Sequence, residues 1–145
     1  EYTITRDKNP LLSDFSWLIY GDLDTDLMKE AAAMIGQTRN FKSFVKANDQ
    51  PYDNDSIIYQ SEIDTTRDGV VIFRIEANRF LRNMVRALTG TLIEIGKHRI
   101  KLHELKEIVE IQDRSNAGAS APAKGLSLVK IKYPSEIFIS NRPKE

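Results

Sequence analysis

The chain has 145 residues, a length that suits one domain with a sizeable core, and its 41% hydrophobic and 29% charged residues are ordinary for a globular protein. It contains no cysteine, which excludes disulfides and thiolate chemistry and is compatible with a reducing cytoplasm, and no apolar run is long enough to predict a membrane span. The net charge is zero, but residues 1–66 carry −6 and residues 67–101 carry +5, so a polyanion-binding surface is expected in the middle of the chain.

The first third of the chain predicts one strand and one helix. Residues Tyr2–Arg6 alternate in the manner of a strand. The segment Asp22–Thr25 supplies capping side chains for a helix over 26–36, which Gly36 ends. The apolar stripe of this helix consists of Leu27, Ala31, Met34 and Ile35.

Two strands, 56–65 and 70–77, are predicted next. Asp68-Gly69 between them is a strong hairpin signal, because both residues tolerate the backbone of a tight turn. The hairpin requires antiparallel pairing, and strands and helices are segregated along the chain. The expected fold is therefore an α+β domain in which helices pack on one face of a largely antiparallel or mixed sheet.

A helix over 78–95, with Asn78 as its N-cap, carries the most informative pattern of the sequence. At helical spacing, Arg79, Arg82 and Arg86 fall within about 60° of one another, opposite an apolar face. Such a row suits phosphate or a carboxylate that must stay ionised, although a merely solvated basic face has the same spacing. Gly90 lies on the same face, where a missing side chain permits another backbone to approach closely.

The C-terminal third predicts a helix over 101–111, a loop of small residues over 113–125, a strand over 126–133 and a short edge strand over 137–141. The loop is either a plain connector or a segment that closes over a ligand, with Lys124 available for phosphate.

Other side chains leave the function open. Phe41, Phe44 and Tyr52 either stack on bases or belong to the core. His98 and His103 match no metal-ligand spacing, so no metal site is expected. Composition and spacing thus indicate a binder of anions or nucleic acid, and no reaction.

Several segments resemble, in order, the C-terminal part of the tRNA pseudouridine synthase A family. The most specific is Ala77-Asn-Arg-Phe-Leu-Arg-Asn-Met-Val-Arg86, followed by Gly90 and Gly96. Asn40-Phe-Lys-Ser-Phe44 and Ala121-Pro-Ala-Lys-Gly-Leu126 also resemble family motifs. The resemblance runs over almost the whole chain.

This resemblance implies an enzyme that isomerises uridine to pseudouridine in the anticodon arm of tRNA, without cofactor or metal, usually as a cytoplasmic homodimer. In the family an aspartate attacks a flipped uridine, and Arg86 matches the arginine that pairs with that aspartate. Phe80 and Leu126 are the candidates for the wall of the uridine pocket. The candidates for RNA contacts are Asn78, Arg79, Arg82, Asn83 and Lys124.

The sequence departs from the family in one respect. The catalytic aspartate belongs to a Gly-Arg-Thr-Asp motif in an N-terminal half, and that motif does not occur in these 145 residues. The chain is therefore expected to be a C-terminal domain, 1–145, that lacks the catalytic-aspartate domain and is inactive alone. The alternative is a stand-alone RNA-binding or interaction module without catalysis.

Overall fold

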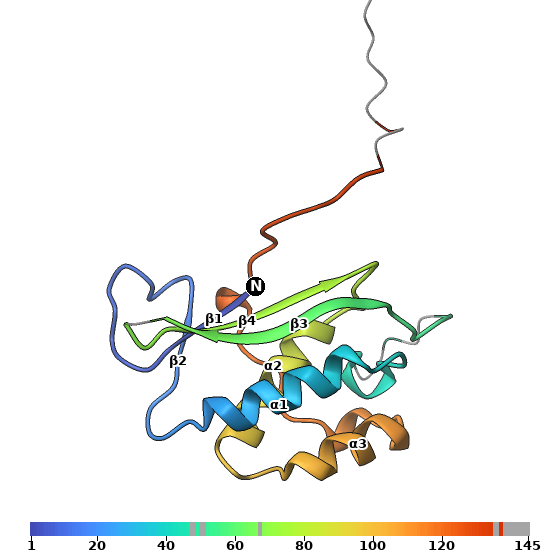
Figure 1. The fold of residues 1–145 in the computed structure, drawn as a ribbon, viewed down its shortest axis with the longest axis horizontal. Coiled ribbons are helices and arrows are strands. Elements are labelled where there is room, and N and C mark those ends of the chain that lie inside the picture. Colours follow the sequence, from blue (N-terminus) through green and yellow to red (C-terminus); the bar gives the residue numbers. More distant parts are fainter. Residues whose placement is uncertain (47–48, 50–51, 67, 135–136, 138–145) are drawn as a thin grey trace, which may run out of the picture.

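One mixed sheet of four strands carries the fold in the computed structural model, which describes residues 1–46, 49, 52–66, 68–134 and 137 (Figure 1). The strand order is β2-β1-β4-β3. The strands are β1 (Tyr2–Thr5), β2 (Trp17–Leu18), β3 (Ile58–Thr65) and β4 (Val71–Ala77). The predicted hairpin is confirmed, since β3 and β4 pair antiparallel with Ile63 opposite Phe73. β1 pairs antiparallel with β4 and parallel with β2, so the sheet is mixed as expected.

The helices α1 (Thr25–Gly36), α2 (Met84–Gly96) and α3 (Leu102–Ile111) all lie on one side of the sheet (Figure 1). The expectation of an α+β fold with helices on one face is confirmed. The Asp24 side chain accepts a hydrogen bond of 2.9 Å from the Leu27 N–H, so the predicted cap of α1 is confirmed too. Among the described residues no helix is both long and apolar enough to cross a membrane.

The core lies between the sheet and α1 and α2. Alternate residues of the strands, such as Ile4 and Phe73, are fully buried against the helices. α2 is the central helix, and most of its residues are buried. Phe41 and Phe44 are fully buried with ring centroids 6.2 Å apart, which confirms that they belong to the core.

The helix predicted over 78–95 starts later than expected, at Met84, and its predicted N-cap Asn78 is wrong. Asn78 instead prolongs the hairpin: its N–H donates to the Ile57 carbonyl and its Oδ1 accepts from the Ile57 N–H. Asn83 then adopts a left-handed backbone with φ of 70°, which turns the chain into α2. Residues 78–83 therefore form a non-helical connector.

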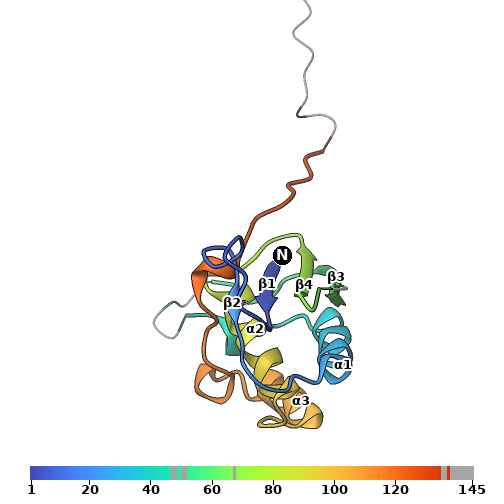
Figure 2. The same cartoon turned by 90° about the vertical axis from the view of Figure 1, so that its left-hand side faces the viewer.

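The strand predicted over 126–133 is also wrong. Only Leu126 forms a bridge, with Tyr2, and residues 127–134 are extended without belonging to a strand of the described chain. They leave the domain on the side of the sheet opposite the helices (Figures 1 and 2). A strand needs hydrogen-bonding partners, and within the described residues the backbone pairing of this segment ends at Ser127, which exchanges two hydrogen bonds with Glu1. The edge strand predicted over 137–141 lies outside the described residues except for Ile137.

Candidate nucleic-acid interface

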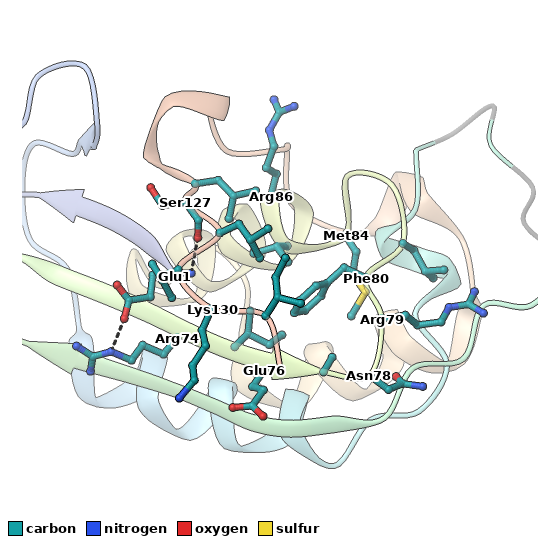
Figure 3. A pocket seen from close by; sticks show the side chains of 18 of the residues that line it. Glu1, Arg74, Glu76, Asn78, Arg79, Phe80, Met84, Arg86, Ser127 and Lys130 are labelled. Carbon is teal, nitrogen blue, oxygen red and sulfur yellow. Dashed lines mark hydrogen bonds and ion pairs between the residues drawn. The ribbon is translucent and has the colours of Figure 1, made fainter. Parts of the chain in front are cut away.

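An open cavity of about 1430 Å³ lies beside the connector 78–83, the first turn of α2 and the extended segment 126–134 (Figure 3). Most of the residues singled out by the sequence contribute to its lining. They are Asn78, Arg79, Phe80, Arg82, Asn83, Arg86 and Leu126. Lys124 is placed elsewhere, where its Nζ donates to the Ser13 carbonyl at 2.7 Å. We call this cavity the groove.

The three arginines do not form a row on one helix face, so that prediction is wrong. Arg79 and Arg82 belong to the connector, and only Arg86 belongs to α2. Figure 3 shows Arg79 and Arg86 projecting in different directions. Arg79 is held by Asp53, whose carbonyl accepts from Nη2 at 2.6 Å and whose carboxylate lies 3.4 Å from Nη1. The side chain of Arg82 is exposed at the edge of the groove.

Arg86 is fixed by the backbone of a distant segment. Its Nε donates to the Ala121 carbonyl at 2.7 Å, and its own carbonyl accepts from the Ala121 N–H at 2.9 Å. Within the described part of the chain, no hydrogen bond donated by its Nη atoms is found. A half-buried guanidinium with both Nη groups available can hold a carboxylate or phosphate through two parallel hydrogen bonds.

The Tyr2 side chain holds the same segment through a second hydrogen bond. Its buried hydroxyl donates to the Pro122 carbonyl at 2.6 Å, so Arg86 and Tyr2 hold two consecutive carbonyls. Burial raises the pKa of Tyr2 to about 12, against an opposing effect of the Arg86 charge. Gly125 packs against the ring, because an added Cβ would lie 2.7 Å from ring carbons. The sequence predicted Tyr2 only as a residue of a strand. No pattern near Tyr2 indicated its hydrogen bond to Pro122, 120 residues away.

A second network joins the connector to the small-residue loop. Asn83 Nδ2 donates to Ser120 Oγ at 2.7 Å, and Arg114 Nη2 donates to the same oxygen at 3.0 Å. Burial lowers the pKa of Arg114. Arg114 lines the groove and was missed as a site residue, because its position there depends on how the loop returns to α2. The side chain of Asn83 is engaged within the protein, which weakens its candidacy for RNA contact.

The loop over 113–125 lies directly on α2. An alanine Cβ at Gly90 would overlap the Ala119 carbonyl oxygen, and one at Gly118 would lie 2.8 Å from the Thr91 Cα. The Gly118 N–H donates to Thr91 Oγ1 at 3.0 Å. The close backbone approach predicted at Gly90 is therefore confirmed.

The acidic side chains in and beside the groove are paired with cations. At the sheet, Arg74 contacts Glu1 at 2.9 Å and Asp64 at 2.8 Å, and its hydrogen bond holds the pKa of Asp64 below the ordinary value. Glu76 is 2.6 Å from Lys132. Among the described residues, the carboxylates that line the groove, Glu1 and Glu76, are thus paired with cations, and the lining also includes Arg82, Arg86 and Arg114. The side chains of Phe80 (42%) and Leu126 (38%), which also line the groove, are partly exposed.

Comparison with known proteins shows the family. A family profile described as tRNA pseudouridine synthase matches residues 31–134. The chain is 38% identical over 139 residues to a tRNA pseudouridine synthase A of Porphyromonas gingivalis, covering 95% of this chain and 55% of that protein. It is 38% identical over 142 residues to that of Bacteroides thetaiotaomicron (95% and 52%) and 41% identical over 111 residues to that of Clostridium acetobutylicum (77% and 45%).

The chain therefore belongs to the tRNA pseudouridine synthase family. It spans about half the length of the curated relatives that it matches.

Proposed function

We propose that this chain forms the arginine-bearing half of an enzyme that isomerises uridine to pseudouridine in the anticodon arm of tRNA. The observation that carries the proposal is the geometry of Arg86. Its Nε donates to the Ala121 carbonyl, and Arg86 lines the same groove as the apolar side chains of Phe80 and Leu126. Family membership supports the reaction class. The proposed enzyme needs no cofactor or metal and acts on tRNA in the cytoplasm as a homodimer.

The proposed role of Arg86 is to keep a catalytic aspartate ionised and oriented. Two hydrogen bonds from the Nη groups lower the pKa of such a carboxylate in a partly desolvated site. The aspartate attacks C1′ of the flipped uridine as the N1–C1′ glycosidic bond breaks, and the released base rotates. Its C5 then bonds to C1′ as the aspartate leaves, and C5 loses its proton to water, which is the hydrogen that tritium labels. The flipped base has left its stack, so the apolar faces of Phe80 and Leu126 suit it.

We propose that the catalytic aspartate comes from outside these 145 residues. The carboxylates of Glu1 and Glu76 in the groove are paired with Arg74 and Lys132. We therefore propose that the 145 residues alone lack isomerase activity and that a preceding domain supplies the nucleophile. RNA contacts are assigned to Arg79, to Arg82 and, more peripherally, to Asn78, Asn83 and Lys124.

The test separates chemistry from binding in the full-length protein. Arg86→Lys keeps the charge but loses the two-point contact, so turnover measured by tritium release from labelled tRNA should fall below detection with tRNA affinity nearly unchanged. Arg82→Ala should instead weaken tRNA binding and reduce the slope of log affinity against log salt by about 0.7 to 0.9. Arg79→Ala should do the same, with an added local cost because Asp53 loses its partner.

Arg99→Ala is the matched control. Arg99 is an exposed arginine that follows α2 and contacts Glu94 at 3.4 Å, and it does not line the groove. Its removal should change neither turnover nor the salt slope. Equal losses of affinity for Arg86→Lys, Arg82→Ala and Arg99→Ala, or robust tritium release by the 145-residue chain, would contradict the proposal. A full-length protein that binds tRNA and never releases tritium would favour the stand-alone binding module.

A further inference from the structure

The first two residues of the chain form a short antiparallel pairing with Leu126 and Ser127. The Glu1 amine donates to the Ser127 carbonyl at 3.0 Å (Figure 3). The Ser127 N–H donates to the Glu1 carbonyl at 2.9 Å. Tyr2 and Leu126 form the adjacent antiparallel bridge. A pair that exchanges both hydrogen bonds alternates with one that exchanges none, so these contacts fix the register beyond Glu1.

The segment that follows Ser127 has the properties of a strand without a partner. Leu128, Val129 and Ile131 are exposed by 74%, 60% and 56%. The backbone is extended, but the described residues give it no ladder. Exposed aliphatic side chains at three of four successive positions are unusual on a finished surface.

We propose that the residues preceding Glu1 in the longer protein continue β1 and pair antiparallel with residues 128–132, so that they build one wall of the groove. The register is specific. The first residue before Glu1 lies opposite Leu128, the second exchanges two hydrogen bonds with Val129, and the fourth does so with Ile131. The relatives are about twice as long as this chain, which provides the polypeptide. A contiguous segment is favoured over a separate partner because no new loop has to close.

Amide hydrogen exchange tests the proposal. We compare the full-length protein with the 145-residue chain, both without RNA, and follow exchange residue by residue in NMR spectra. The amides of Val129 and Ile131 should slow by about 100-fold or more in the full-length protein. The amides of Leu128 and Lys130 point to the other edge of the ribbon and serve as internal controls, since this pairing does not protect them.

Two proline variants test whether the protection depends on the edge of the segment that carries the proposed hydrogen bonds. Val129→Pro removes a ladder donor and should abolish the protection of Ile131, whereas Leu128→Pro removes an N–H on the other edge and should retain it. Equal exchange of Val129 and Ile131 in both proteins would overturn the proposal. So would protection in the 145-residue chain that disappears on dilution, because a second copy would then occupy the edge. The readout requires no catalysis, so its failure is distinguishable from failure of the proposed function.

Discussion

Replacing Gly90 by alanine measures how much the contact between α2 and the small-residue loop contributes to stability. Within an isolated helix this change should favour the folded state by about 1 kcal/mol. Here the added Cβ would overlap the Ala119 carbonyl oxygen and lie 2.9 Å from the Ala119 carbonyl carbon. Both atoms belong to the backbone, so the loop must move away from the helix.

The cost follows from the contacts that this movement breaks. Overpacking a close contact costs about 1–3 kcal/mol. The loop is held by the Gly118–Thr91 hydrogen bond and by the reciprocal pair between Arg86 and Ala121. Losing some of these bonds costs about 1 kcal/mol each. After subtracting the helix preference, Gly90→Ala should lower the free energy of unfolding by about 2–4 kcal/mol and the melting temperature by about 10 °C.

Urea denaturation with Gly36→Ala as control provides the assay. Gly36 is also helical, but an added Cβ there meets only the Ser61 Cβ at 3.5 Å. Its replacement should be neutral or stabilise the protein by up to about 1 kcal/mol. Gly118→Ala should resemble Gly90→Ala, and the double variant should lose less than the sum because both break the same contact. If Gly90→Ala were as stable as Gly36→Ala, the packing of the loop described above would be wrong.

Two further predictions concern single hydrogen bonds. Folded Tyr2 keeps its proton to about pH 12, whereas an ordinary tyrosine ionises near pH 10, so the unfolded state loses protons first and the free energy of unfolding should fall as pH rises through this interval. Tyr2→Phe should remove this part of the pH dependence in urea titrations, and an unchanged slope would refute it. Asp24→Ala removes the cap of α1 and should destabilise the protein by about 1 kcal/mol, whereas Asp24→Asn should retain most of the stability. Equal thermal stability of the two variants would contradict the capping role.

The elements that the sequence determined are those governed by local interactions. Asp24 caps α1 three residues away, Asp68-Gly69 reverses the chain between β3 and β4, and the apolar period of residues 101–111 matches α3. The sequence also predicted that the missing side chain at Gly90 permits another backbone to approach closely. Each of these signals involves residues within one or two turns of chain, so sequence order is nearly equivalent to spatial proximity.

Only the tertiary structure decided how the candidate site is assembled. Residues 78–83 have helical spacing, but pairing of Asn78 with Ile57 and the left-handed Asn83 hold them outside α2 and separate Arg79 and Arg82 from Arg86. The setting of Arg86 depends on Ala121, across 35 residues. Tyr2 reaches the next carbonyl across 120 residues. Contacts between residues far apart in the sequence form only when the whole chain has folded, so no pattern of neighbouring residues predicts them. Helix caps, turns and apolar periodicity act within a few residues and can therefore be recognised in the sequence.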